Sequence, residues 1–546
     1  MSKKSSLRPR NVSKTSVDLQ GDRLSVPKGF CGLGKRYFDL LGQDSLNVLQ
    51  VDAVTGTTET KGVVKSRSIQ VATSLKKQGV RAGNVVVIIG KNHINQTIAV
   101  LASLFLGAIV APLDPEFSNS EYLELLNKLK PKVCFCDSRP MSQIQTVVSN
   151  MKINPLLINF GAGSEGMSFA SLLNIKEDET FTPVSISDPA TSVVFILPTQ
   201  GTTGTPKLIC LSHYSIYVQT KTLLEIFNYP DKVLSYAPLS WILQAVLVCA
   251  SFEADVIRIL FTGTISERNV CKMIHDFHIA HALFSVDYAN KLISNAGIKD
   301  YNLSCLQCVL LNAVNTHYEI LHLKKLLPHV KFLQCYCLTE TGCIAVTTDS
   351  NYNSSLDKPN SVGRLAHNSK IKIIDLDTKE NLGQDNYGEL YFSGDGVMLG
   401  YLKDSEATQA AIEKGYLKTG DMAMFDEDGW IYLKGRIEDL IVMDNYRLCP
   451  SELEDIILAH PFCQGCRDRK DMIACVIKNS DKSLTEEKLL KYISERVPEF
   501  NRPTKIIFMD EFPRTSVGHI VKRKLRESLL RTNLDYATSL SSIPNI

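Results

Sequence analysis

The sequence has little net charge and no long apolar run, and both shortages limit what the protein can be. Its 546 residues carry 60 basic and 58 acidic side chains, a formal net charge of +2 at pH 7. Such a small excess creates no global field that would attract a nucleic acid or an anionic membrane. A membrane-spanning helix needs roughly 18 uninterrupted apolar residues. The longest candidate, residues 97–113, contains Gly107 and Pro112 and is predicted to be a buried helix followed by a strand.

Targeting signals are also scarce. Residues 1–17 contain basic side chains and no acidic ones, but they lack a clear apolar face. Residues 1–25 are therefore expected to be a disordered basic tail. The C-terminus ends at Ile546 without a Ser-Lys-Leu type of peroxisomal signal. No secretory signal accompanies the 15 scattered cysteines, so we expect reduced, intracellular thiols.

The length of the chain and its apolar periodicity predict two domains. A chain of 546 residues is too long for one ordinary core. Between about residues 60 and 440, short apolar strands such as 85–89 alternate with helical patterns such as 93–106, which predicts an α/β fold with buried sheets. Residues 26–435 are predicted to form the large domain. Residues 436–546, which contain helical patterns at 450–458 and 485–497, are predicted to form a small α+β domain.

The strongest local signal is the string Thr199-Gln200-Gly201-Thr202-Thr203-Gly204-Thr205-Pro206-Lys207. It lies between predicted strands at 193–197 and 208–211, and Ser212 could cap the next helix. Its glycines let the backbone amides approach an anion, while its hydroxyls and Lys207 add donors and positive charge. It is not a Walker loop, because no Gly-Lys-Ser/Thr triplet closes it. The string therefore predicts a polyphosphate-binding loop, with a polar hairpin turn as the structural alternative.

This string resembles the signature loop of the adenylate-forming (AMP-binding) superfamily, which includes acyl-CoA synthetases and firefly luciferase, and the chain is most similar to its insect members. Other family motifs follow in the expected order and cover most of residues 50–530. Residues 334–341 resemble the Gln-Gly-Tyr-Gly-x-Thr-Glu segment, and residues 416–421 resemble the Thr-Gly-Asp motif. Residues 435–441 resemble the interdomain hinge motif, and residues 394–401 also match a family string.

The resemblance implies a role for each motif residue. The phosphates of ATP would be held by the loop residues Thr199, Gly201, Thr202, Thr203, Gly204 and Lys207. Tyr336 would stack on adenine, Thr339 would contact the α-phosphate and Glu340 would ligate Mg²⁺, since a carboxylate oxygen suits a hard cation. Asp421 would accept both ribose hydroxyls, Arg436 would contact ribose or phosphate, and Glu438 would lie at the hinge. Trp241 would line the acyl pocket, or be a core aromatic.

The sequence departs from the family pattern where catalysis should occur. His519 occupies the position of the adenylation lysine in the string Pro513–Ile520. A histidine is shorter and mostly neutral at pH 7 unless nearby phosphate raises its pKa. Its presence is expected to slow adenylation on the order of 10²-fold. Other departures are Gln200 and Leu208 in the loop, Asn312, Val314 and Asn315 in the pocket segment, Asp444 and Asn445 after the hinge, and a shortening after His460 that suggests a missing strand or an incomplete sequence.

The family chemistry implies an ATP-dependent carboxylic acid:CoA ligase that works through an acyl-adenylate, with ATP and Mg²⁺ bound and CoA as co-substrate. Its partner would be a small fatty or aromatic acid, and its compartment the cytoplasm or the peroxisome. A catalytically weakened protein that binds nucleotide or acyl ligands is the alternative.

Two rival classes have less support. Zinc could be held by His275, His278 and His281 on one predicted helix, or by the pairs Cys305/Cys308 and Cys463/Cys466. Oxidation of a luciferin-like adenylate is remote, because the fold alone does not confer it.

Overall fold

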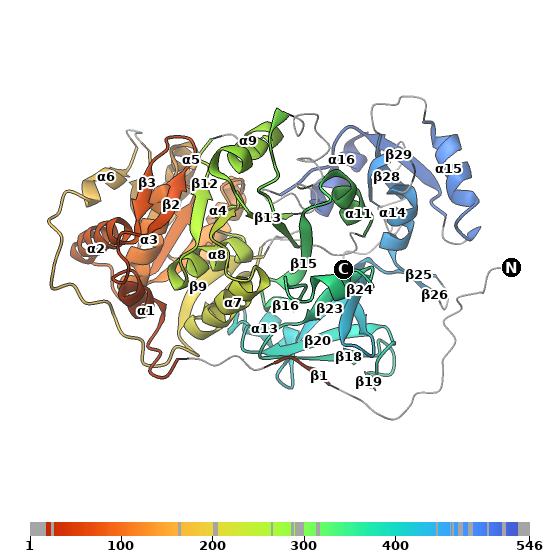
Figure 1. Ribbon diagram of the computed structural model, residues 1–546, viewed down its shortest axis with the longest axis horizontal. Coiled ribbons are helices and arrows are strands. Elements are labelled where there is room, and N and C mark those ends of the chain that lie inside the picture. Colours follow the sequence, from red (N-terminus) through yellow and green to blue (C-terminus); the bar gives the residue numbers. More distant parts are fainter. Residues whose placement is uncertain are drawn as a thin grey trace.

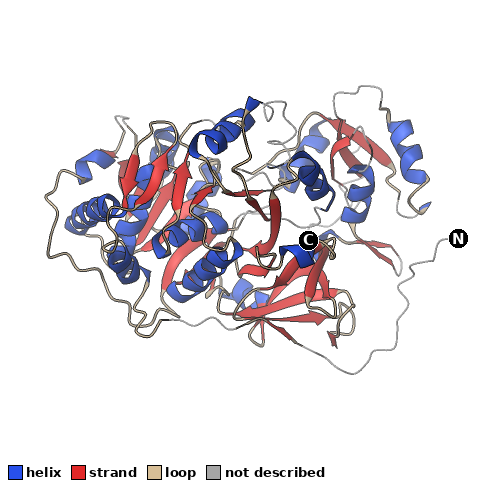
Figure 2. Ribbon diagram, in the orientation of Figure 1, coloured by secondary structure: helices blue, strands red, loops and turns tan. Residues whose placement is uncertain are grey.

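The computed structural model describes residues 18–22, 27–161, 165–199, 206–263, 266–285, 289, 300–312, 317–443, 446–458, 460, 463–467, 473–478, 484–499, 502–515 and 520–532. Helices and strands alternate through the first half of the chain, and a region rich in antiparallel strands follows (Figures 1 and 2). The predicted basic tail is shorter than expected, because Leu19–Gln20 form strand β1 and pair antiparallel with β18. Residues 1–17 lie outside the described part of the chain.

One sheet has eight strands in the order β21-β10-β9-β5-β4-β6-β7-β8. The bounds of its strands are β4 Val85–Ile89, β5 Ile109–Leu113, β6 Val133–Cys136, β7 Leu156–Asn159, β8 Met167–Ser168, β9 Val193–Pro198, β10 Leu208–Ser212 and β21 Gly400–Tyr401. The helices of this part are α1 Leu33–Leu40, α2 Lys61–Lys77, α3 Ile94–Phe105, α4 Asn119–Leu129, α5 Ser138–Ser149 and α6 Phe169–Leu172. The pairs from β4 to β8 are parallel and nearly every residue of β4 and β6 is buried, as expected for strands covered on both faces.

A sixteen-stranded sheet forms the rest of the large body. Its parallel part contains β2 Val48–Asp52, β11 Lys232–Leu234, β12 Ile257–Leu260, β13 His281–Ser285, β14 Cys308–Asn312 and β15 Lys331–Leu338, with β3 Thr58–Thr60 antiparallel at its edge. Its antiparallel part contains β16 Gly342–Val346, β17 Ser361–Leu365, β18 Ser369–Ile374, β19 Asn381–Leu382, β20 Gly388–Gly394, β22 Ile412–Glu413, β23 Tyr416–Phe425 and β24 Trp430–Arg436. The helices of this part are α7 His213–Ile226, α8 Ile242–Glu253, α9 Glu267–Phe277, α11 His317–Leu326, α12 Tyr352–Ser355 and α13 Ser405–Ala411.

Helix α7 connects the two sheets. It contacts β9 and β10 of one sheet and β16 of the other. Its N-cap is Ser212, as predicted, and the Ser212 hydroxyl accepts a hydrogen bond from the amide of Ser215 at 3.0 Å. Such a cap satisfies a backbone donor that the first helical turn leaves free. Helix α7 therefore packs against a strand that precedes it, β10, and against β16, the strand that follows β15.

The C-terminal elements form separate, smaller sheets (Figure 1). After β24 come the short 3₁₀ helix η2 Ile437–Asp439, β25 Ile441–Met443, β26 Tyr446–Leu448, α14 Pro450–Leu458, β27 Cys463–Arg467, β28 Ile473–Lys478, α15 Glu486–Ser494, β29 Lys505–Met509 and α16 Lys522–Thr532. Strand β27 lies where the sequence suggested a missing strand, so a strand is present there. The shortening after His460 stays a prediction. The division into two mobile domains at residue 435 stays a prediction.

The zinc hypothesis rested partly on one helix that carries three histidines, and this expectation is wrong. Helix α9 ends at Phe277, His278 has a left-handed backbone with φ of 50°, and His281 begins strand β13. Among the described residues, no group of three His, Cys, Asp or Glu side chains is placed to hold a metal ion. The thirteen cysteines whose side chains are described are free thiols.

Within the described part of the chain, no helix combines the length and apolarity needed to cross a bilayer.

Candidate nucleotide site

The base of the predicted phosphate loop is a β-hairpin made by β9 and β10. The Thr199 amide donates to the Lys207 carbonyl at 2.8 Å, and the Lys207 amide donates to the Thr199 hydroxyl at 2.9 Å. These two bonds extend the ladder one residue beyond the strands, whose last pair is Leu208 with Pro198. Residues 200–205, which include the predicted Gly201, Thr202, Thr203 and Gly204, lie outside the described residues. The structure therefore defines both ends of the loop.

A half-buried carboxylate lies close to this hairpin. Glu340 is in the turn between β15 and β16, and its Oε1 accepts a hydrogen bond from the Tyr401 hydroxyl at 3.1 Å. Tyr401 is on β21, which pairs with β10, and its ring centroid lies 4.8 Å from Lys207 Nζ. A cation over an aromatic face is attracted to the ring quadrupole. Tyr401 therefore links the lysine of the loop to the predicted Mg²⁺ ligand.

Sequence reasoning missed Tyr401 as a site residue. It is the last residue of the glycine-rich string 394–401, which was recognised only as a family match. The signal in the sequence was its position directly after Gly400. In the structure, Gly400 has a φ of 145° and lies so close to Thr408 that a side chain would not fit. The backbone at this point is fixed, so the next side chain has a defined direction.

A second cluster joins strands β15, β23 and β24 around Asp421. The Tyr336 hydroxyl donates to Asp421 Oδ2 at 2.5 Å, and Arg436 Nη1 donates to Asp421 Oδ1 at 3.2 Å. Arg436 also donates to the Thr419 carbonyl at 2.9 Å. Asp421 and Arg436 are direct cross-strand partners in the β23–β24 ladder, a geometry in which opposite charges attract. Each carboxylate oxygen retains a further lone pair, so Asp421 can accept additional donors.

The two clusters are electrostatically coupled. Burial raises the pKa of Glu340, while the Tyr401 hydroxyl and the positive charges of Arg436 and Lys207 lower it in part. Burial also raises the pKa of Asp421, and Arg436 and the Tyr336 hydroxyl act against it. Both carboxylates are therefore more costly to ionise here than in water. A cation or a set of hydrogen-bond donors at this site would offset that cost.

The residues present fit a divalent cation bound with phosphates. Among the described residues, Glu340 forms no ion pair, and its partner Tyr401 is neutral. Mg²⁺ typically takes one or two protein carboxylates and completes its shell with water and phosphate oxygens. Glu340 next to the phosphate loop satisfies this requirement.

Three predicted residues have placements that bear on their roles. Tyr336 is 1% exposed and its ring belongs to the hydrophobic core between β15 and β20, so adenine stacking stays a prediction. Thr339 is half-buried and adjacent to Glu340. Trp241 is 5% exposed within the largest hydrophobic cluster, which is the arrangement of a core aromatic.

The remaining predicted positions lie at the C-terminal side. Glu438 is exposed in η2, with Oε1 3.7 Å from Arg436 Nε. Lys522 on α16 forms an ion pair with Asp439 of the same 3₁₀ helix. His519, the position of the family lysine, and Asp444 and Asn445 lie outside the described residues.

The hairpin that carries Tyr336 and Glu340 also holds a group of thiols. Cys337 on β15 faces Cys343 on β16, and Cys335 lies two residues before Cys337. Hydrogen bonds from Cys335 and Cys337 lower the pKa of Cys343, and the same contacts raise the pKa values of the two donors. Cys335 and Cys337 occupy the two glycine positions of the motif that residues 334–341 resemble. Side chains therefore fill space that glycine would leave open beside Tyr336.

Comparison with known proteins adds independent evidence. The family model for the AMP-binding enzyme matches residues 50–402. Luciferin 4-monooxygenase from Photinus pyralis is 27% identical over 85% of this chain and 88% of its own length, and 4-coumarate-CoA ligase 1 from Narcissus pseudonarcissus is 26% identical over 90% and 92%. These relatives span both the hairpin and the Asp421 cluster.

Solved structures show the same architecture. The luciferase-like enzyme from the nonluminescent mealworm Zophobas morio superposes with a TM-score of 0.72 at 25% identity, covering 77% of this chain and 99% of that one. ATP-bound MatB from Rhodopseudomonas palustris gives a TM-score of 0.81 at 21% identity over 91% of this chain and 98% of its own, which is evidence for the fold alone. The predicted fold class, a large α/β part followed by a small α+β part, is confirmed. Because the matched region holds the loop base, Tyr336, Glu340 and Tyr401, the chain belongs to the AMP-binding enzyme family.

Proposed function

We propose that the protein is an ATP-dependent carboxylic acid:CoA ligase that works through an acyl-adenylate. The strongest support is that one hairpin contributes to two sites. On β15, the Tyr336 hydroxyl donates to Asp421. In the turn after β15, Glu340 accepts a hydrogen bond from Tyr401, whose ring lies against Lys207 Nζ. A ribose acceptor and a metal–phosphate site that share one hairpin suit one nucleoside triphosphate. The relatives include 4-coumarate-CoA ligases, and coumarate is a small aromatic acid, which supports an aromatic acid as substrate; a fatty acid is the alternative.

The reaction would have two steps. In the first, a carboxylate oxygen of the acid attacks the α-phosphorus of ATP, a carbon–oxygen–phosphorus linkage forms, and the bond to the β-phosphate breaks to release pyrophosphate. In the second, the thiolate of CoA attacks the acyl carbon and AMP leaves. The enzyme would act mainly by holding the reacting groups in line and by stabilising charge on the phosphoryl oxygens.

The residues of this chain would divide that work. Asp421 would accept the two ribose hydroxyls while Tyr336 and Arg436 keep its carboxylate in place. Lys207 would donate to the phosphates from the end of the loop, and Tyr401 would orient Glu340. Mg²⁺ bound to Glu340 would supply charge neutralisation on the phosphate oxygens.

The C-terminal elements would complete the site in two orientations. Rotation about the segment that contains Glu438 would bring residue 519 to the nucleotide for the first step and the β25–β26 segment for the second. Domain rotations of this kind complete catalytic sites in many enzymes. The Lys522–Asp439 ion pair would then belong to one orientation.

A second candidate function is nucleotide or acyl binding with little ligase activity. It is favoured by one feature, His519 at the position of the family lysine. The same replacement of a fixed positive charge by histidine leaves the nucleotide contacts of Asp421 and Lys207 untouched. Binding would therefore persist when adenylation is slow.

Pyrophosphate release from Mg·ATP tests both candidates. The purified full chain would be measured against a panel of medium-chain, long-chain and aromatic acids, alongside a His519→Lys variant, with ATP binding followed in parallel. Acid-dependent release by the unmodified chain, accelerated on the order of 10²-fold by His519→Lys, is the expected result. If both proteins bind ATP and neither releases pyrophosphate with any acid, the ligase proposal is wrong and the binding function is supported.

A further inference from the structure

Three thiols gather on the β15–β16 hairpin, whose turn carries Glu340 (Figure 1). Cys335 and Cys337 are two positions apart on β15, so both side chains leave the same face of the strand. Cys343 on β16 is the direct cross-strand partner of Cys337. Both thiols of β15 donate hydrogen bonds to Cys343. The three sulfur atoms are therefore neighbours in the reduced protein.

An irregularity in the ladder creates this pairing. Tyr336 faces Ala345 across the two strands. An unshifted antiparallel ladder would therefore place Ile344 opposite Cys337. The register shifts by one residue between Tyr336 and Cys337, and this shift places Cys343 there instead. Such a bulge redirects a side chain, and here it brings one thiol to face another.

The backbone spacing selects Cys337 and Cys343 as the pair that suits a disulfide. Residues directly opposite in an antiparallel ladder have Cα atoms about 4.5–5.5 Å apart, and disulfides span Cα separations of about 4.4–6.8 Å. Cys335 is separated from Cys337 by two residue steps along one strand, about 6.6 Å, near the upper limit. The cross-strand partner of Cys335 is Val346, which has no sulfur.

The two thiols differ in exposure and in acidity. Cys337 is partly exposed, whereas Cys343 is buried. The hydrogen bonds from its two neighbours lower the pKa of Cys343, and they raise the pKa of Cys337. Because the thiolate is the form that reacts with oxidants, Cys343 is the thiol that reacts first. The partial exposure of Cys337 gives an oxidant as small as hydrogen peroxide access to the pair.

We propose that Cys337 and Cys343 are a site of reversible oxidation by peroxide, at which a cross-strand disulfide forms and weakens nucleotide binding. The Cys343 thiolate attacks one peroxide oxygen, the oxygen–oxygen bond breaks, and a sulfenic acid and one water form once the released hydroxide takes up the thiol proton. The Cys337 sulfur then attacks the sulfur of Cys343, the sulfur–oxygen bond breaks, and a second water leaves with the thiol proton. Two thiols are oxidised and one peroxide is reduced.

The disulfide would act on both clusters of the candidate nucleotide site. Its two Cβ atoms are about 3.8 Å apart, closer than the roughly 4.5–5.5 Å of an ordinary cross-strand pair, so oxidation draws the strands together beside the turn. Glu340 in that turn accepts from Tyr401 at 3.1 Å, and Tyr336, directly before Cys337, donates to Asp421. This effect rests on the proposed function. Affinity for Mg·ATP is expected to fall about 10-fold on oxidation, because hydrogen bonds to these carboxylates are displaced.

Mass spectrometry of the full chain tests the bond itself. The protein is treated with hydrogen peroxide, alkylated with N-ethylmaleimide and digested with trypsin without reduction. The tryptic fragment 332–364 contains Cys335, Cys337 and Cys343 and no other cysteine. It is expected to carry one alkyl group, on Cys335, to lack two hydrogen atoms, and to give no fragment ions between positions 337 and 343. Three alkylated thiols, higher oxides without a bond, or a bond that includes Cys335 would each overturn the proposal.

Matched variants and nucleotide binding complete the test. Cys343→Ser is expected to abolish the bond, whereas Cys335→Ser, which removes a buried thiol of the same hairpin, is expected to retain it. The fragment measurement on the unmodified chain stands even where a variant does not fold. Dithiothreitol should restore the affinity for Mg·ATP, and peroxide should leave the affinity of Cys343→Ser unchanged. A bond without a change in affinity refutes the effect on binding. Absence of Mg·ATP binding in both redox states refutes the nucleotide function, and the fragment mass still decides the disulfide.

Discussion

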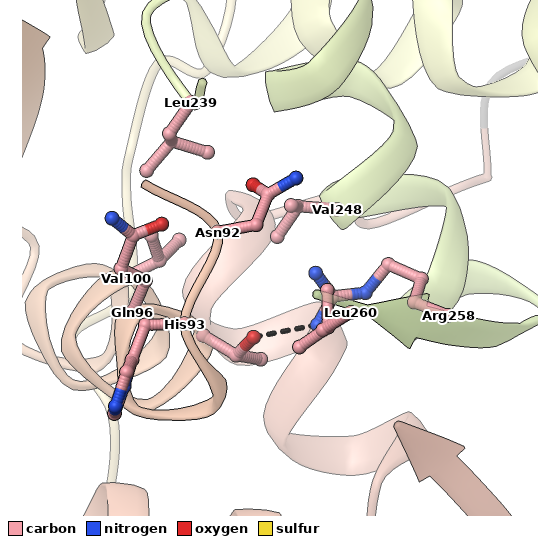
Figure 3. A pocket seen from close by; sticks show the side chains of 9 residues that line it. Asn92, His93, Gln96, Val100, Leu239, Val248, Arg258 and Leu260 are labelled. Atoms are coloured by element: carbon pink, nitrogen blue, oxygen red, sulfur yellow. Dashed lines mark hydrogen bonds between the residues drawn. The ribbon is translucent and has the colours of Figure 1, made fainter. Parts of the chain in front are cut away.

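The candidate nucleotide site and the buried Arg258 of strand β12 (Figure 3) treat a charge in opposite ways. At the nucleotide site, Asp421 faces Arg436 across two antiparallel strands, and the pKa of Arg436 is raised by that carboxylate and by Glu438. In the core, Arg258 donates to the neutral acceptors Gln50 and Thr97, and its pKa is lowered by burial. An opposite charge as cross-strand partner thus favours the ionised form of a buried group, whereas burial without such a partner disfavours it.

The largest effect is expected for Asp421→Asn. The amide keeps the size of the side chain but loses one acceptor and the charge, so affinity for Mg·ATP should fall on the order of 100-fold, about 2.7 kcal/mol. Titration calorimetry measures this directly, and Glu413→Gln on the neighbouring strand β22 is the control, with unchanged affinity.

The stability of Asp421→Asn at pH 7 should not decrease, in contrast to its affinity for Mg·ATP. The folded-state pKa of Asp421 is raised, so its ionised form costs stability at pH 7, and that cost is relieved as the pH falls through the folded pKa. Asp421→Asn should therefore be at least as stable as the unmodified chain at pH 7. A variant that binds ATP normally would contradict the role assigned to this carboxylate.

His213 shows a third way to bury a basic group, as a neutral ring. Its side chain is 2% exposed, its Nδ1 accepts from the Leu33 amide at 3.2 Å, and burial lowers its pKa to about 4. The unfolded chain binds the proton more tightly, so this contribution to stability is complete above about pH 6.5 and is lost as the pH falls toward 4.

Between pH 7 and pH 5 this group should account for a loss of about 2 kcal/mol. His213→Asn retains an acceptor oxygen near the Leu33 amide and cannot be protonated. Urea unfolding at both pH values should show a smaller decrease for the variant than for the unmodified chain. Identical pH dependences would mean that His213 is protonated in the folded protein.

A smaller effect is expected for Tyr336→Phe. The variant removes the hydroxyl that donates to Asp421 and keeps the ring in the core, so affinity for Mg·ATP should fall about 10-fold. Tyr416→Phe is a matched control, because it also removes a hydroxyl that donates to a carboxylate, Asp18 at 3.1 Å, but on the outer face of β23. A loss of similar size in both variants would show that the effect is not local to Asp421.

The smallest effect is expected for the free energy of unfolding of Arg258→Met. Gln50 Oε1 would still accept from the Thr97 hydroxyl at 2.7 Å, and an apolar side chain replaces an uncompensated charge, so the change should be within about 1 kcal/mol. Arg36→Met is the contrast, because Arg36 pairs with Glu253, whose side chain is 1% exposed and would keep only Lys221 at 3.3 Å. A loss of about 3 kcal/mol is expected there. Equal losses in the two variants would remove the distinction between paired and unpaired arginines.

Much of the fold could be predicted where local pattern and burial agree. The bounds of β4 and α14 match the predictions, because a continuous apolar run defines the first and a proline-led helical pattern defines the second. Prediction was less accurate where a cap or a turn determines the residue at which a helix begins or ends. Helix α2 begins at Lys61 because the Thr60 side chain accepts from the Val63 amide, and His281 left its predicted helix because His278 adopts a left-handed backbone.

The sequence by itself determined the family and the α/β class, and it predicted candidate nucleotide-site residues other than Tyr401, because contiguous motifs with their own chemistry carry this information. Tertiary structure alone decided which distant side chains meet. Tyr401 reaches Glu340 across 61 positions, and Arg258 reaches Gln50 across 208. Such contacts depend on strand order and register, which bring β21 to β10 and β12 to β2. Local periodicity carries no information on that order, because the alternation of residues along a strand does not depend on which strand lies beside it.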